Sequence, residues 1–156
     1  MGLKKVLSRS KSDFEEFPDL ITQINDANNH EEIFEILDIA EHQKIAKRLR
    51  YLHEITQDND PEDPAMKFIS LRRLALFFAS DDVSLPNPEI GISPSGLLQA
   101  EWHSSKAIAL MKFPPDGNIV FAATLTIDRQ NGSHDVHGTG GKELALQAIR
   151  PFISRF

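Results

Sequence analysis

The chain has 156 residues, a formal net charge of −6 and no cysteine. This length predicts one compact domain whose core needs neither disulfide nor metal, and the lack of cysteine excludes disulfides, thiolate catalysis and cysteine-ligated zinc or iron–sulfur sites. The acidic balance disfavours a general nucleic-acid or membrane-surface binder, which would carry excess basic charge. No apolar stretch approaches the roughly 20 residues of a membrane span, and the N-terminus lacks the pattern of a secretory signal, so we expect a cytoplasmic protein.

The character of the sequence changes near residue 80. The first 80 residues hold 11 of the 17 Lys and Arg and 15 of the 23 Asp and Glu, whereas seven of the eight glycines lie after residue 90. A charge-rich, glycine-poor segment followed by a segment with glycines at intervals is typical of helices followed by a sheet. We therefore predict an α+β fold with a flexible basic tail over 1–11 and a single domain over 12–156, divided into a helical part (12–80), a sheet (88–140) and a C-terminal helix (141–156).

Three helices are predicted in the helical part. An apolar stripe runs from Phe14 to Ile24, and Pro18 places the start of the first helix near itself. A second stripe follows the N-cap residue Asn29 and continues to Ile55, with acidic side chains at its start and basic ones in its second half, as the helix dipole favours. A third helix begins at an Asp-Pro pair within 60–64. Because this helix is apolar on most sides, we expect it at the centre of the domain.

Turn sequences divide the second half into four or five strands. The turns are Ser93-Pro94-Ser95-Gly96, Pro114-Pro115-Asp116-Gly117 and Asn131-Gly132. Short turns join antiparallel neighbours, so we predict a meander. The central strands are moderately apolar on both faces; either helices cover both sides of the sheet or one face docks a partner. The predicted strands cover 89–93, 97–103, 106–113, 118–128 and 133–137.

The tripeptide Glu101-Trp102-His103 is the most distinctive of the predicted sheet. Strand alternation places Trp102, the only tryptophan, on the face of Leu98, where we expect it to anchor the core. Gln99, Glu101 and His103 then share the opposite face. A carboxylate beside an imidazole can act as an acid/base pair, but no nucleophile at a fixed spacing accompanies them. A polar binding face is therefore the favoured interpretation.

Two further patterns suggest chemistry without meeting its spacing rules. His134 and His137 are three residues apart, which on a strand directs them to opposite faces and makes them poor joint metal ligands. The run from Gly138 to Lys142 departs from the phosphate-binding loop pattern at Val136 and Glu143, so it predicts a tight turn between a strand and a helix. We expect neither a metal nor a cofactor.

Basic side chains occur in two groups within the predicted helices. Lys44, Lys47 and Arg48 share one face with a tyrosine, a pattern found in nucleic-acid binders, although a solvated face with salt bridges is favoured here. Arg72 and Arg73 interrupt an apolar helix and therefore need partners. Acidic side chains of the second helix could supply them, or the pair could face a binding partner.

The segment from Pro88 to Trp102 carries a resemblance to known sequences. It consists of a proline, an apolar strand, a Ser-Pro-Ser-Gly turn and a second strand that ends in Glu-Trp. Over about 88–127, including the later turn Asp116-Gly117, the chain resembles small uncharacterised bacterial proteins. Some of these are encoded beside toxin genes or in mobile elements, which implies an antitoxin or accessory role. The resemblance carries fold information and implies no site residue.

These observations favour a non-enzymatic regulatory protein of the antitoxin or inhibitor kind, which neutralises a partner protein by occluding it. An acidic protein suits a basic partner such as a nuclease, because complementary charge speeds association. The partner is expected to be another protein or a second copy of the chain. One alternative is a small hydrolase or metal-dependent enzyme that uses Glu101, His103, His134 and His137. The other is a nucleic-acid-binding regulator that uses Lys44, Lys47, Arg48 and the basic tail.

Overall fold

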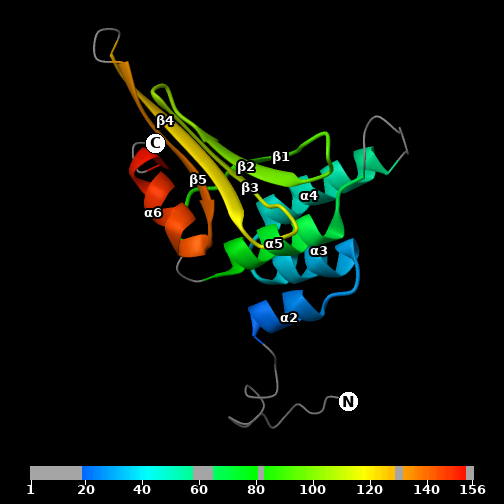
Figure 1. Ribbon diagram of the computed structural model, residues 1–156. Coiled ribbons are helices and arrows are strands. Elements are labelled where there is room, and N and C mark those ends of the chain that lie inside the picture. The colour runs from blue at the N-terminus through cyan, green and yellow to red at the C-terminus, as the bar shows by residue number, and fades with distance from the viewer. Residues whose placement is uncertain (1–18, 58–64, 81–82, 129–131, 154–156) are drawn as a thin grey trace, which may run out of the picture.

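The computed structural model describes residues 19–57, 65–80, 83–128 and 132–153 (Figure 1), so the predicted tail over 1–11 lies outside the described residues. Five helices and one five-stranded antiparallel sheet make up this part of the chain, which confirms the α+β class. The elements in chain order are α2 (Leu20–Asp26), α3 (His30–Ile39), α4 (Gln43–Thr56), α5 (Phe68–Ala79), β1 (Glu89–Ile92), β2 (Leu98–His103), β3 (Ala107–Lys112), β4 (Ile119–Asp128), β5 (Gly132–Gly140) and α6 (Lys142–Ile153).

The sheet is the predicted meander, with strand order β1-β2-β3-β4-β5 and every neighbouring pair antiparallel. Its buried face carries the core side chains of all the central strands, among them Leu98, Met111 and Phe121. The helices lie on this side (Figure 1): α4 packs against β1, α5 against β2, and α6 against β3, β4 and β5. Among the described residues no helix packs on the other side. The described residues therefore exclude the alternative in which helices cover both faces of the sheet, and docking of a partner on the open face stays a prediction.

The predicted central helix and core tryptophan are both confirmed. Helix α5 packs against the sheet on one side and against α2 and α3 on the other, and most of its side chains are buried. Trp102 is only 2% exposed, and its indole Nε1 donates a hydrogen bond of 2.8 Å to the carbonyl oxygen of Pro86. This bond ties β2 to the connector that follows α5.

Ser70 on α5 is a fully buried polar residue that joins the helix to the sheet. Its hydroxyl donates to the carbonyl oxygen of Phe113 over 2.6 Å and accepts from the amide of Leu98 over 2.8 Å. Leu98 begins β2 and stands opposite Phe113, the residue directly after β3, and the amide of Phe113 donates directly to the carbonyl of Leu98. In an antiparallel pair of this kind the Leu98 amide would normally donate to the Phe113 carbonyl as well. Here the serine hydroxyl lies between these two groups and bonds to both.

The predicted second helix is in fact two helices, α3 and α4, that pack against each other. The chain turns at Glu41, whose φ of 67° lies in the left-handed region. The amide of His42 donates to the carbonyl of Leu37, and the amide of Glu41 donates to the carbonyl of Asp38. These are the two bonds of a Schellman C-cap, which ends α3 before the chain enters α4. The charge gradient expected for one long helix dipole is consequently wrong, because the acidic and basic ends belong to different helices.

Replacing Glu41 by glycine should stabilise the protein by about 0.5–1 kcal/mol. The left-handed conformation is strained for a residue with a Cβ atom and unstrained for glycine, while the added freedom of the unfolded chain offsets part of the gain. Urea unfolding followed by tryptophan fluorescence measures the difference. Glu35, exposed within α3, provides the matched control, since Glu35→Gly should destabilise by about 1 kcal/mol. A loss of stability in Glu41→Gly would contradict the assigned cap.

Several element boundaries differ from the prediction. The first helix begins at Leu20, with the Asp19 side chain accepting from the amide of Thr22 over 2.7 Å. The third begins at Phe68 rather than at an Asp-Pro pair; residues 58–64 lie outside the described part, and Ala65–Lys67 are not helical. Helix α6 runs to Ile153 in spite of Pro151.

The last strand is longer than expected and includes the first part of the glycine run, up to Gly140. Gly138 and Gly140 belong to β5, where a turn was predicted, and α6 begins only at Lys142. Gly138 pairs with Phe121, and a Cβ atom on Gly138 would lie 2.9 Å from the end of the Phe121 ring. The glycine therefore leaves room for an aromatic ring that packs across the strand, so its role is steric.

Candidate binding face of the sheet

The side of the sheet turned away from the helices is the candidate site, and we call it the open face. Register places its side chains in straight rows across the strands. One row crosses all five strands and consists of Glu89, Glu101, Leu110, Ala122 and His137. A neighbouring row contains Gln99, Lys112, Val120 and Thr139, and a third contains His103, Ile108, Thr124 and Asp135.

The centre of the open face is apolar. Ile108 on β3 is 49% exposed and Val120 on β4 is 40% exposed, with the partly buried pair Leu110 and Ala122 between them. An antiparallel sheet with one wet face usually alternates apolar and polar side chains, so apolar residues at adjacent open positions are unusual. Such a cluster with a polar rim is typical of surfaces that bind another protein.

The predicted polar row along β2 is formed as expected. Gln99 Nε2 donates to Glu101 Oε2 over 3.2 Å, and the other carboxylate oxygen, Oε1, lies 3.3 Å from His103 Nε2. The carboxylate of Glu101 is thus held from both sides. Glu89 lies directly opposite Glu101 on the edge strand, and like charges in this position repel. This flank of the open face would therefore favour a positively charged group from outside.

The structure does not unite the four residues of the predicted Glu/His site. Glu101 and His103 lie on β2, whereas His134 and His137 lie on β5, three strand spacings or about 14 Å away. His134 pairs with Leu125 on the helix-covered side, while His137 pairs with Ala122 on the open face. This opposite orientation follows the predicted alternation. Within the described ranges no three His, Asp or Glu side chains are grouped so as to hold a metal ion.

Arg72 and Arg73 donate to backbone carbonyls, and not to the acidic side chains of the second helix that were one of the two alternatives for them. Arg72 donates to the carbonyl of Ala27 over 2.6 Å and stacks over the Phe68 ring at 4.7 Å. Arg73 donates to the carbonyl of Pro115 over 3.5 Å. The two arginines hold the loop after α2 and the β3–β4 turn against α5, on the side of the sheet away from the open face.

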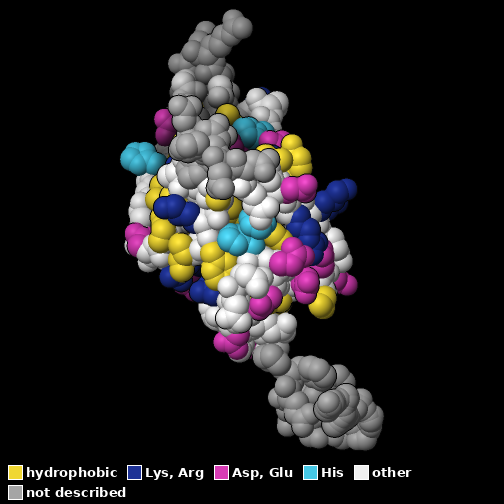
Figure 2. Space-filling view, turned by 90° about the vertical axis from the view of Figure 1, so that its right-hand side faces the viewer, with side chains coloured by type: hydrophobic (Ala, Val, Ile, Leu, Met, Phe, Trp, Pro, Cys, Tyr) yellow, Lys and Arg dark blue, Asp and Glu magenta, His cyan; other side chains and the backbone are white. Residues whose placement is uncertain are grey.

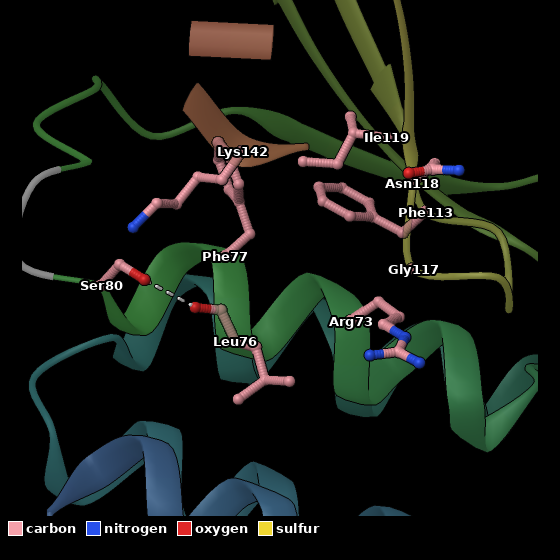
Figure 3. A pocket seen from close by; sticks show the side chains of 9 residues that line it. All are labelled: Arg73, Leu76, Phe77, Ser80, Phe113, Gly117, Asn118, Ile119 and Lys142. Carbon is pink, nitrogen blue, oxygen red and sulfur yellow. Dashed lines mark hydrogen bonds between the residues drawn. The ribbon is translucent and has the colours of Figure 1, made fainter. Parts of the chain in front are cut away.

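A cavity of about 220 Å³ lies beside Arg73, between α5, the β3–β4 turn and the start of α6 (Figure 3). Phe77, Phe113 and Ile119 supply its apolar wall. In Figure 3 the charged ends of Arg73 and Lys142 point to opposite sides of the cavity rather than toward one another. The lining includes none of the predicted Glu and His residues, so the cavity offers no evidence for the hydrolase alternative.

The predicted basic face on α4 is present beside the sheet edge. Lys44, Lys47, Arg48 and Tyr51 line one shallow exposed depression. Arg48 has a structural partner there, because its Nε donates to the carbonyl of Ile90 on β1 over 2.9 Å, and its guanidinium lies 5.3 Å from the Tyr51 ring centre. Nucleic-acid binding through this face stays a prediction.

A histidine pair that the sequence did not reveal joins α3 to α4. The rings of His30 and His53 stack with centres 4.3 Å apart, and His30 Nε2 lies 3.0 Å from the carbonyl oxygen of Met66. Figure 2 shows histidine side chains near the centre of the face turned to the viewer, with acidic and basic side chains beside them. The adjoining ion pairs link Arg50 to Glu31 and Asp38. Long-range helix packing creates the pair, so no local motif announces it.

Acid should weaken the fold through His53. Burial, together with the charge of His30, lowers the pKa of His53 below its ordinary value of 6.5. The folded state therefore holds His53 neutral while the unfolded chain takes up a proton, so stability is full above pH 6.5 and falls as the pH decreases toward the lowered pKa. Urea midpoints measured at steps from pH 7.5 to 5 should decrease. In His53→Asn the decrease should be smaller; an unchanged pH profile would contradict this role.

Comparison with protein-family models, curated protein sequences and solved structures finds no match to this chain. The resemblance over 88–127 and its antitoxin implication therefore remain predictions. No helix of the described residues is long and apolar enough to cross a membrane.

Proposed function

We propose that this protein is a regulatory binding protein, antitoxin- or inhibitor-like, that docks a basic partner protein on the open face of its sheet and occludes it. The observation that supports this proposal is the asymmetry of the sheet. All five described helices lie on one side, and the other side leaves Ile108 and Val120 in solvent. A partner that covers them would gain the burial of their apolar surface.

The charges around the apolar centre favour a basic partner. Glu89 and Glu101 repel each other across β1 and β2, and Asp135 adds a further carboxylate on β5. A lysine or arginine side chain placed between Glu89 and Glu101 would relieve this repulsion. The net charge of −6 acts in the same direction at long range, because it accelerates encounter with a positively charged surface.

The geometry supports binding more than catalysis. Glu101 and His103 lie on the helix-free face of the sheet with their side chains partly exposed, and neither lines the cavity beside Arg73. General acid–base catalysis needs a substrate held within hydrogen-bond reach, which a cleft or a metal usually provides. An interface needs an apolar centre and a polar rim, and the open face has both.

Ile108→Lys should abolish partner capture while leaving the fold intact. The substitution places a charge at the apolar centre of the open face, where a docked partner would bury it without a counter-ion. Ile39→Lys is the matched control, since Ile39 is 84% exposed on α3, away from the sheet. The tagged full chain and both variants are used to isolate complexes from the organism that makes the protein, and each captured protein is quantified against the bait.

The proposal requires one stoichiometric protein captured by the unaltered chain and by Ile39→Lys, and lost with Ile108→Lys. Once that protein is purified, adding the unaltered chain should suppress its activity, and adding Ile108→Lys should not. Equal capture by Ile108→Lys would contradict docking on the open face. Full activity of the partner in the complex would contradict occlusion.

A further inference from the structure

We propose that two copies of this chain pair along β5, antiparallel and centred on Val136, so that their sheets join into one. The proposal concerns the edge of the sheet and is independent of the open-face partner. Three features carry it: the unprotected edge of β5, a self-complementary register, and an apolar stripe on α6 beside the same edge.

The two edges of the sheet differ in protection. Strand β1 is only four residues long, lies between Pro88 and Pro94, and has its Ile90 carbonyl occupied by Arg48. Short strands, flanking prolines and covered edges prevent unwanted pairing. Strand β5 has nine residues without proline or lysine, and no described strand pairs with its outer edge. It is the edge able to accept a further strand.

The hydrogen-bonding pattern shows which groups of β5 face outward. The amide of Thr126 donates to the carbonyl of Lys106, so even-numbered residues of β4 bond to β3 and odd-numbered ones bond to β5. The β4–β5 register then directs His134, Val136, Gly138 and Gly140 toward β4. The backbone groups of Ser133, Asp135, His137 and Thr139 consequently point to the outer edge.

A two-fold axis at Val136 uses all of these outward groups. It places Asp135 of each copy opposite His137 of the other and Ser133 opposite Thr139, and each of these is a hydrogen-bonded pair. Asp135 and His137 both have side chains on the open face, so each carboxylate meets an imidazole rather than a like charge. A shift of the axis to residue 135 would instead bring the two Asp135 carboxylates together. The register centred on Val136 therefore gives the longest overlap of the two β5 strands and also pairs unlike side chains.

Helix α6 presents apolar surface beside the same edge. Leu144 is 49% exposed and lies against Gly140 at one end of β5. At the other end, a groove of about 260 Å³ is lined by residues that include Leu125, His134 and Phe152. The proposed register places the Gly140 end of one copy beside the Gly132 end of the other. Leu144 of each copy would thereby approach the groove of the other and lose its exposure to water.

A charge-swap series tests the register. His137→Asp places two carboxylates opposite each other at two symmetric positions, and Asp135→His places two imidazoles there. The double variant Asp135→His/His137→Asp restores unlike pairs. Sedimentation equilibrium of the full chain should give a dimer whose Kd rises about tenfold or more in His137→Asp and returns toward the original value in the double variant. Circular dichroism verifies that each variant is folded.

Hydrogen exchange tests the same edge without any substitution. The amides of Asp135, His137 and Thr139 should become protected as protein concentration rises through the Kd, whereas those of Val136 and Gly138 should be protected at every concentration. A chain that stays monomeric, or a dimer whose Kd the swaps leave unchanged, would overturn the proposal. A dimer disrupted by Ile108→Lys but not by His137→Asp would assign self-association to the open face instead and would also overturn it.

Discussion

Replacing Ser70 by alanine is expected to lower the free energy of unfolding by about 2–4 kcal/mol. The hydroxyl is completely buried and serves two backbone groups, accepting from the Leu98 amide and donating to the Phe113 carbonyl. Alanine fills nearly the same space but leaves both groups without a partner, and each unsatisfied buried group costs about 1–3 kcal/mol. Urea unfolding with Trp102 fluorescence as the probe measures the loss.

Ser80→Ala is the matched control for this prediction. Ser80 lies at the end of the same helix, and its hydroxyl donates only to the Leu76 carbonyl over 3.0 Å at a partly exposed site. Water can replace that bond, so the change should stay within about 0.5 kcal/mol. If Ser70→Ala were equally mild, the strands would have closed to form the direct bond, and the bridge would not be needed for stability.

Phe113→Ala should destabilise the protein by about 3–5 kcal/mol, the range for deleting a buried aromatic ring. Phe113 is 1% exposed, and its ring centre lies 5.6 Å from that of Phe77 and 6.5 Å from that of Phe78. It also forms part of the wall of the 220 Å³ cavity. Removing the ring would enlarge this existing space, and α5 is held in place by Ser70 and Arg73, so the surroundings cannot readily collapse into it.

Two further variants show whether the loss of stability comes from the removed apolar volume at a buried position. Phe113→Leu retains much of the apolar volume and should lose less than half as much stability as Phe113→Ala. Ile39→Ala, at an 84% exposed position, should change stability by less than about 0.5 kcal/mol. A loss below 1 kcal/mol in Phe113→Ala would indicate that the core around α5 repacks freely.

The sheet was largely predictable because its signals are local. Turn residues such as Pro115, Gly117 and Gly132 mark the strand ends, and alternation of side chains fixes which face each residue occupies. Alternation therefore predicts Trp102 in the core and Gln99, Glu101 and His103 together on the other face, as the structure has them. Coverage of the sheet was not predictable, since it depends on where α6 and α5 pack.

The helical half differs from the prediction at Glu41, where the chain ends one helix and begins another without the glycine that usually marks such a position. Glu41 occupies a left-handed position usually held by glycine, so nothing in its residue type announced a helix end. The available signal was the spacing of five from the apolar position Ala40 to the next, Ile45, because the apolar side of a continuous helix repeats every three or four residues. The longer β5 was missed for the opposite reason, since its glycines suggested a turn.

The candidate site residues were predictable where they share one strand and not where tertiary packing brings them together. Residues on one strand, such as Glu101 and His103, were brought together as expected, whereas Arg72 and Arg73 found partners that only tertiary packing supplies. The stacked pair His30 and His53, and the bridge formed by Ser70, join elements far apart in the chain. Side chains whose role depends on such distant contacts leave no periodic pattern in the sequence.

Pairing of the strands in chain order has a kinetic consequence. In the described part of the chain every strand bonds to its neighbour in sequence, and none crosses over another to reach its place. Each hairpin therefore closes a short loop, which costs little entropy and favours rapid folding. Because β5 leaves the ribosome after the other strands, β1 to β4 can associate before it is made, and β5 then covers the outer edge of β4 by pairing with its nearest neighbour along the chain.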